Sequence, residues 1–298
     1  CVDPAPKLRE GFARSAASVL FSATLFPKVY YERLLGVGDE ANWYALESPF
    51  PPEKLGVFVL PIQTTYRTRE RTAADVAAAI ATFVRAKRGN HIVFFPSYAY
   101  MALIAGHYSA DLGETVVHQT RDMDERAREE WLASFRAGGC VTGFALMGGI
   151  FGEGVDLAGE RLIGVMIVGV GLPQPDVERD LTRDYFGDDG EQFAYQYPGM
   201  QRVLQTAGRL IRTETDEGTL CLVDARFTQT FYRALMPRSW SPRLVVPDRF
   251  GEALDAFWSG TERGDTVTIS PSVTSIHPSH DGALPYLPQR DGTLHREL

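Results

Sequence analysis

Short apolar segments alternate with segments of helical periodicity along most of this sequence. The apolar segments that we expect to form strands are residues 19–22, 55–62, 91–95, 115–118, 141–147, 162–170 and 219–224. Apolar side chains recur at helical spacing in residues 72–88, 97–112, 122–135, 176–186, 192–212 and 228–235. This alternation indicates βαβ units, and strands that are apolar throughout are typical of a parallel sheet covered on both faces. The sequence therefore predicts an α/β fold, in which Pro198 starts or kinks its helix.

Composition narrows the class of protein. Hydrophobic residues make up 44% of the 298 residues, which is enough for a sizeable core. No apolar run reaches the roughly 20 residues that span a membrane, so the longest one, residues 161–173, is expected to contain a buried strand. Cys1, Cys140 and Cys221 have neither metal-ligand spacing nor a disulfide pattern, which predicts a reducing, cytoplasmic environment. The net charge of -8 provides no general attraction to nucleic acid, so any such contact must be local.

A glycine-rich loop follows the expected strand of residues 141–147. Four glycines occur in the seven residues 148–154, and they allow the backbone to approach a ligand closely. Glu153 and Asp156 add carboxylates that could meet a ribose hydroxyl, a metal-bound water or an arginine. Ligands of parallel sheets bind beyond the carboxyl ends of the strands, where this loop is expected to lie. A flexible loop without a ligand explains the same residues equally well.

Small polar and aromatic side chains follow two other expected strands. Ser97 is a natural N-cap for the next helix, and the N-terminus of that helix also suits a phosphate oxygen. Tyr98 is either a core aromatic or a surface on which a base stacks. Ser22 and Thr24 could relay hydrogen bonds between two ligands, although such a short segment is weak evidence alone.

Two arginines close to residue 210 are candidates for an anion site. Gln205, Arg209 and Arg212 stand at i, i+4 and i+7 of the expected helix and would project from one side. Two arginines and a glutamine on a rigid helix make a fork that suits a polyphosphate. An ordinary solvated helix face has the same spacing. Asp224 and Arg226, at the end of the last strand, predict a local ion pair at least as readily as a catalytic role.

The order of these motifs is more specific than any one of them. The segments are, in order, Phe21-Ser22-Ala23-Thr24-Leu25, Phe94-Phe95-Pro96-Ser97-Tyr98, Phe151-Gly152-Glu153-Gly154-Val155-Asp156-Leu157 and the stretch from Gln205 to Arg212. They resemble motifs III, IV, V and VI of the C-terminal motor domain of superfamily 2 helicases and are most similar to the XPD/DinG group. The resemblance covers roughly residues 14–236. Ala23 stands where the group often has Gly, Gly152 where it often has Trp, and Gln174 in a loop that is often more apolar.

The resemblance implies a RecA-like parallel sheet with helices on both faces, the three-layer fold of P-loop NTPases. It also implies ATP and Mg²⁺ in a cleft between two such domains, and movement along single-stranded DNA. It assigns catalysis to Gln205, Arg209 and Arg212, ATP binding to Glu153, Gly154 and Asp156, coupling of the two sites to Ser22 and Thr24, and DNA binding to Ser97, Tyr98, Gly148 and Gly149.

The parts of such a motor that are absent define the expected domains. The sequence contains no Gly-x-x-x-x-Gly-Lys-Ser/Thr phosphate loop and no cysteine cluster for an iron–sulfur centre. We expect residues 1–27 to be the last strand of a first motor domain and a linker, residues 28–260 the second domain, and residues 261–298 a polar tail. The first domain, upstream of Cys1, would hold the phosphates, Mg²⁺ and any iron–sulfur cluster. The expected partners are that domain and single-stranded DNA, without a membrane, in a monomeric protein.

Two other classes of protein stay open. A non-catalytic RecA-like module that binds nucleic acid or a protein would explain the acidic charge and the glycine-rich loop, but it has no use for a phosphate-directed arginine fork. A Rossmann-type oxidoreductase or glycosyltransferase shares the α/β class, but no Gly-x-Gly-x-x-Gly turn follows an early strand. A phosphate loop encoded upstream of Cys1 would separate the helicase from both.

Overall fold

The computed structural model describes residues 1–38, 41–152, 156–261 and 267–268. Its centre is a sheet with the strand order β3-β4-β2-β5-β6-β1-β7-β8. The strands are β1 (Leu55–Leu60), β2 (His91–Phe95), β3 (Thr115–His118), β4 (Val141–Leu146), β5 (Gly164–Val168), β6 (Gly218–Val223), β7 (Arg243–Leu244) and β8 (Val267–Thr268). Strands β1 to β7 pair in parallel, and β8 pairs with β7 in the antiparallel direction. The predicted parallel sheet is confirmed.

Each central strand buries both of its faces, which explains why these segments are apolar throughout. In β5, Val165 and Ile167 enter one core, while Met166 and Val168 enter the other. Successive side chains of a strand point to opposite faces, so an uninterrupted apolar run supplies both cores at once.

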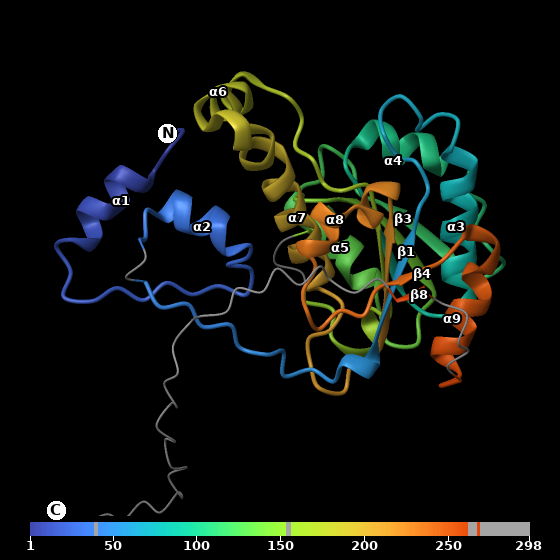
Figure 1. Ribbon diagram of the computed structural model, residues 1–298. Helices are drawn as coiled ribbons and strands as arrows, with labels where there is room; N and C mark the ends of the chain where they lie inside the picture. The colour runs from blue at the N-terminus through green and yellow to red at the C-terminus, as the bar shows by residue number, and fades with distance from the viewer. Residues whose placement is uncertain (39–40, 153–155, 262–266, 269–298) are drawn as a thin grey trace, which may run out of the picture.

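Helices cover both faces of the sheet (Figure 1). One face packs against α3 (Ala73–Ala86), α4 (Tyr98–Ala105) and α9 (Phe250–Trp258), and the other against α5 (Glu125–Ser134), α7 (Tyr197–Ala207) and α8 (Thr230–Ala234). The connection from β4 to β5 lies on the α7 side, where Phe151 and Leu157 are buried in the core. This loop therefore covers part of the sheet that a helix would otherwise cover.

The N-terminal helices lie beside the sheet rather than on it (Figure 1). They are α1 (Ala5–Phe12) and α2 (Lys28–Leu35), and they lie near α6 (Val177–Phe186). The Tyr30 ring packs on Phe193 and Tyr197, with centroid distances of 5.4 and 5.0 Å. The Tyr185 hydroxyl donates a hydrogen bond of 2.7 Å to Asp3. These contacts join the first 35 residues to α6 and to the start of α7.

The strand predicted at residues 19–22 is not formed in this structure. These residues have no regular structure in the fold, and Val19 and Phe21 are 82% and 90% exposed. A strand needs a neighbour for its backbone N–H and C=O groups, and within the described residues this segment is not part of the sheet. Apolar composition alone could not show that.

The predicted helix at residues 192–212 starts with a π-helical turn, Gln192–Gln196, and ends as α7 at Ala207. Pro198 lies in the first turn of α7, as predicted, and it has no N–H to donate to the carbonyl of Ala194. Arg179 Nη1 donates to that carbonyl instead, at 3.3 Å. Arg209 and Arg212 therefore lie beyond the helix and do not share its face with Gln205. Likewise, the helix predicted at residues 97–112 ends at Ala105.

A carboxylate explains why α7 stops early. Asp216 accepts hydrogen bonds from the backbone N–H groups of Arg212 at 2.7 Å and Thr213 at 2.9 Å. In a continued helix these groups would bond to carbonyls one turn back, so the carboxylate competes with the helix for them. Gly208, the residue after α7, adds a weak helix former at the same point.

Candidate functional site

Arg209 and Arg212 are held on the glycine-rich loop that follows β4. Arg209 Nε donates a hydrogen bond of 3.2 Å to the carbonyl oxygen of Gly152. Arg212 Nε lies 3.2 Å from Asp156 Oδ1. The loop in turn is fixed by Phe151, whose ring stacks on Trp131 at a centroid distance of 3.9 Å. Two segments more than 50 residues apart in sequence thus form one cationic surface.

The other residues assigned to this site differ in position. Gln205 is exposed in the last turn of α7, directly before the segment that carries the arginines. Asp156 is exposed beside Arg212. Glu153 and Gly154 lie outside the described residues. The arginine fork is therefore built from a helix end and a loop rather than from one helical face.

This surface extends toward the amino ends of the strands. The ideal position of a Cβ on Gly218, the first residue of β6, lies 2.8 Å from Leu210 Cδ1. Gly159 N donates to Asp216 Oδ1 at 3.1 Å, which ties the end of the β4–β5 loop to the same region. Helix α7 joins the carboxyl end of β5 to the amino end of β6, so the residues after it must lie at the amino edge of the sheet.

Asp216 organises the backbone of this surface and was not found from the sequence. Burial alone would raise its pKa, but the Thr213 hydroxyl and three backbone N–H groups donate to its carboxylate. These hydrogen bonds stabilise the charged form and hold the pKa of Asp216 below its ordinary value. The signal that could have found it is an acidic residue two positions before a strand, within a turn of polar residues.

The residues assigned to DNA binding meet at the carboxyl edge of the sheet. The Ser97 hydroxyl accepts from Tyr100 N at 3.2 Å and caps α4, as predicted. The Tyr98 hydroxyl donates to the Thr120 carbonyl at 3.1 Å. Gly148 adopts φ of +67°, which favours glycine. A Cβ on Gly149 would lie 3.1 Å from Gln119 Nε2, which places this loop next to the end of β3.

Gln119 joins Tyr98 to the glycine-rich loop and was also missed. Its Nε2 donates to the Tyr98 hydroxyl at 3.2 Å, and its Oε1 accepts from Leu146 N at 2.9 Å. The guanidinium of Arg121 lies 4.8 Å from the centroid of the Tyr98 ring, so one face of that ring is already covered. Gln119 and Arg121 follow β3 directly, and the rule that ligands bind at carboxyl ends of strands could have found them.

Ser22 and Thr24 lie on an exposed segment that contacts α7. The Ser22 and Thr24 hydroxyls are 3.4 Å apart, and Ser22 Oγ accepts from Thr24 N at 3.2 Å. Gln201, a buried residue of α7, donates through its side-chain nitrogen to the carbonyl of Phe26. The segment is therefore linked to the helix that leads to Arg209.

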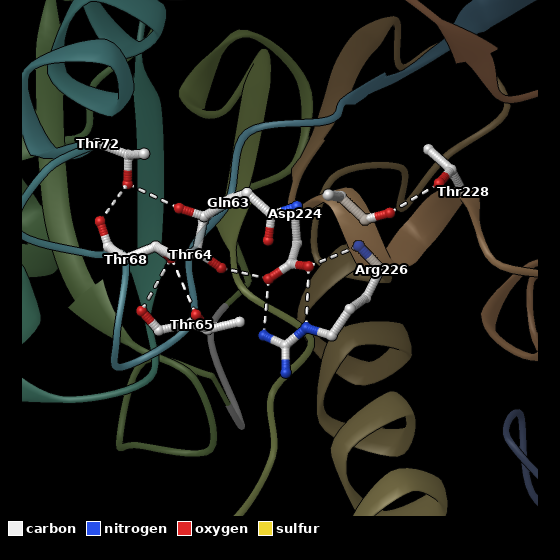
Figure 2. Close-up of polar contacts among 9 residues, drawn as sticks. Gln63, Thr64, Thr65, Thr68, Thr72, Asp224, Arg226 and Thr228 are labelled. Carbon is white, nitrogen blue, oxygen red and sulfur yellow. Dashed lines mark hydrogen bonds and ion pairs between the residues drawn. The ribbon is translucent and has the colours of Figure 1, made fainter.

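Asp224 and Arg226 form the predicted ion pair, and Thr64 joins it (Figure 2). Arg226 Nε and Nη2 donate to the two carboxylate oxygens of Asp224 at 2.9 and 2.7 Å. The Thr64 hydroxyl donates to the same carboxylate. The Asp224 side chain is 1% exposed, whereas that of Arg226 is 24% exposed. The bidentate pair lies directly after β6, and the Thr64 hydrogen bond connects it to the segment that follows β1.

The described residues show neither a metal-binding cluster nor a membrane-spanning helix. They contain no group of three or more His, Cys, Asp or Glu side chains placed to hold a metal ion. Within the same residues, no helix has the length and apolar character needed to cross a membrane.

Comparison with known proteins identifies the family. Residues 80–243, more than half of the chain, match the helicase C-terminal domain family. A probable ATP-dependent helicase of Methanocaldococcus jannaschii is 28% identical in an alignment of 222 positions that covers 68% of this chain and 33% of that protein. The ATP-dependent DNA helicase chl1 of Aspergillus clavatus is 22% identical in an alignment of 293 positions that covers 82% of this chain and 40% of that protein. The chain thus spans about a third of the length of the curated relatives it matches.

Solved structures agree on the fold. An XPD helicase structure superimposes with a TM-score of 0.61 at 21% identity, over 76% of this chain and 42% of that chain. A second XPD structure gives a TM-score of 0.56 over 75% of this chain. The fold is therefore RecA-like, as the motif order implied, and this chain belongs to the helicase C-terminal domain family.

Proposed function

We propose that this chain is the second motor domain of an ATP-dependent DNA helicase. The relatives above are named as helicases, and one observation on this chain supports the nucleotide role in particular. Arg209 and Arg212 are fixed on the β4–β5 loop by Gly152 and Asp156. Two permanently charged, planar guanidinium groups on one loop surface suit a polyphosphate better than any smaller anion.

The chemical role of the arginines is electrostatic. Bound ATP would supply a terminal phosphoryl group, and Arg209 and Arg212 would stabilise the charge that develops on it during transfer. An arginine in this role contributes about 10³–10⁵ in rate. Arg212 would have to leave Asp156 to do so, and that ion pair is exposed, with side chains 38% and 71% accessible. Exposed pairs are worth about 0–1 kcal/mol, so the rearrangement costs little.

In this proposal, residues next to the arginines hold the backbone in place and contact the nucleotide. Asp216 keeps the backbone of Arg212 in position while its side chain turns toward the phosphates. Gln205, on the exposed last turn of α7, would contact the same nucleotide. Asp156, once released, would be available to a ribose hydroxyl, and Glu153 and Gly154 were assigned to the same role.

A companion domain of the same protein would hold the triphosphate and Mg²⁺. The sequence of this chain has no phosphate loop. Any iron–sulfur cluster would also belong to that domain. We further propose that the protein is cytoplasmic and monomeric, and that residues 1–27 connect the two domains.

Single-stranded DNA would bind at the carboxyl edge of the sheet. Ser97 with the N-terminus of α4, and the backbone at Gly148 and Gly149, offer N–H and hydroxyl groups to phosphates. Tyr98 would offer a base the ring face that Arg121 leaves uncovered, while its hydroxyl is held by the Thr120 carbonyl. The β4–β5 loop would join the two surfaces. It starts at the DNA surface, with Gly148 and Gly149, and continues to the nucleotide surface, where Gly152 and Asp156 contact the arginines. Ser22 and Thr24, linked to α7 through Phe26, would couple nucleotide state to DNA.

The decisive experiment measures DNA-stimulated ATP hydrolysis by the full protein that contains this chain. Arg209→Ala and Arg212→Ala are each expected to lower the rate by about 10³-fold or more, with oligonucleotide affinity unchanged. Arg85→Ala is the matched control, because Arg85 is exposed on α3, on the opposite face of the sheet. Near-normal hydrolysis by both arginine variants would refute the nucleotide role.

A further inference from the structure

The loop that follows β1, residues 63–72, belongs to neither the nucleotide surface nor the DNA surface proposed above, although its Thr64 binds Asp224. It lies at the carboxyl edge of the sheet, next to the turn that carries Ser97. An ideal Cβ on Gly169 would lie 3.6 Å from Thr64 Oγ1 and 3.8 Å from Pro96 Cγ, so these two side chains flank one point. The loop and the Ser97 turn are therefore neighbours, although they are about 30 residues apart in sequence.

The base of the loop is tied to the sheet by the buried ion pair of Asp224 and Arg226. Thr64 donates to the Asp224 carboxylate, which the two N–H groups of the Arg226 guanidinium also bind (Figure 2). Burial and the nearby Asp224 charge raise the pKa of the Tyr100 phenol to about 12, while the guanidinium of Arg69 acts in the opposite direction. The loop, α4 and the end of β6 thus meet at one place.

Threonine side chains fix the conformation of the loop itself (Figure 2). The Thr72 hydroxyl donates to the Gln63 carbonyl at 2.7 Å and closes the loop at its base. The Thr65 and Thr68 hydroxyls are 2.9 Å apart. Local hydrogen bonds of this kind hold a turn in one conformation, so little conformational entropy is lost when it binds a ligand.

Such a braced loop displays an aromatic ring to solvent. Tyr66 is 80% exposed, and the guanidinium of Arg69 lies 4.0 Å from its ring centroid, on one face. Three arginines, Arg67, Arg69 and Arg71, occur within five residues of a chain whose net charge is -8. An exposed aromatic ring with an arginine on one face, in a segment rich in arginine, is a combination on which bases of single-stranded nucleic acid stack, while the cations attract the backbone.

We propose that Tyr66, backed by Arg69, is a base-stacking platform that extends the DNA path from the Ser97 turn to the loop after β1, an inference that rests on the proposed DNA-binding function. The ligand is single-stranded DNA, and the group recognised is the face of a base rather than its edge. The platform therefore contributes affinity without sequence preference. Asp224 and Arg226 act as positioning residues, because they hold the loop through Thr64.

The test is the affinity of the protein for a fluorescent oligo-dT of about 15 nucleotides and for an oligonucleotide of the same length with abasic sugars. Tyr66→Ala is expected to weaken oligo-dT binding by about 5- to 100-fold. The abasic strand has the same backbone charge but no bases, so the same variant should bind it as well as the unmodified protein does. Tyr66→Phe should behave normally with both, since stacking needs no hydroxyl.

Tyr44→Ala is the matched control, because Tyr44 is 76% exposed but lies outside the loop. Unchanged thermal unfolding of Tyr66→Ala would exclude a folding defect. Normal oligo-dT binding by Tyr66→Ala overturns the platform and leaves the DNA function intact, and so does an equal loss on both strands. Failure of the unmodified protein to bind either strand at low salt overturns the DNA function and the platform together.

Discussion

Removing the guanidinium of Arg226 should destabilise the fold far more than removing any exposed arginine. We consider Arg226→Met, which keeps most of the apolar stem. The Asp224 carboxylate is 1% exposed and would lose both guanidinium donors. It would keep the Thr64 hydroxyl and the backbone N–H of residue 226.

The expected cost follows from that environment. Breaking a buried ion pair by removing one partner costs about 3–5 kcal/mol, because the other charge stays buried. Two donors remain on Asp224, so we expect the lower end, about 3 kcal/mol. The matched control is Arg212→Met, whose pair with Asp156 is exposed, and there we expect about 0–1 kcal/mol.

The assay is urea unfolding followed by circular dichroism, with the midpoint compared at constant m-value. A second variant sharpens the test. Adding Asp224→Asn to Arg226→Met removes the stranded charge, so the double variant should be more stable than Arg226→Met alone. Equal costs for Arg226→Met and Arg212→Met, or a double variant that is less stable still, would refute the reasoning. Arg226→Met should also weaken oligo-dT binding, because the guanidinium would no longer hold in place the Asp224 carboxylate to which Thr64 of the loop binds.

Three further predictions concern the same surfaces. Asp216→Asn should remove a stability contribution that is fully present above about pH 4 and is lost as the pH falls through the depressed pKa of Asp216. The acid unfolding curves of the unmodified protein and of this variant should therefore converge at low pH. Parallel curves would contradict this. Gly171→Ala should destabilise by about 1–3 kcal/mol or more, because φ is +69° and the new Cβ would lie 2.5 Å from the carbonyl oxygen of Gly199, whereas Gly138→Ala, with φ of +71° and no atom within 4 Å, should show the strain alone in the same thermal assay. The isolated chain should hydrolyse ATP negligibly in a phosphate-release assay, and robust turnover would contradict the assignment of the triphosphate to another domain.

Much of the fold could be predicted from the sequence, because a strand that is buried on both faces is apolar throughout and can be recognised from its own residues. Residues 91–95 and 115–118 were predicted as strands and are β2 and β3 with the same bounds. The strands β1, β4 and β5 lie within their predicted segments, and β6 is shifted by one residue from the predicted segment 219–224. The segment 19–22 is the exception, since apolar residues form a strand only beside a neighbour, and its neighbour cannot be read from its own residues.

The candidate site was predicted in its parts but not in its assembly. Arg209, Arg212, Asp156 and the glycine-rich loop were singled out separately, as residue types that suit a nucleotide. The prediction that Arg209 and Arg212 share one helical face was wrong. Asp216 ends α7 at Ala207, because its carboxylate binds backbone N–H groups beyond that residue. Propensity and periodicity describe neighbours along the chain and contain no information about a competing carboxylate.

What the sequence determined by itself is the alternation of elements, and through the order of four motifs, the family. What the tertiary structure decided is which residues meet. Arg209 reaches Gly152 across 57 positions, Gln119 joins Tyr98 to the β4–β5 loop, and Thr64 reaches Asp224 across 160 positions. Such contacts depend on strand order and on the path of each connection. Local periodicity fixes only which face of an element is buried, so these meetings arise when the sheet assembles.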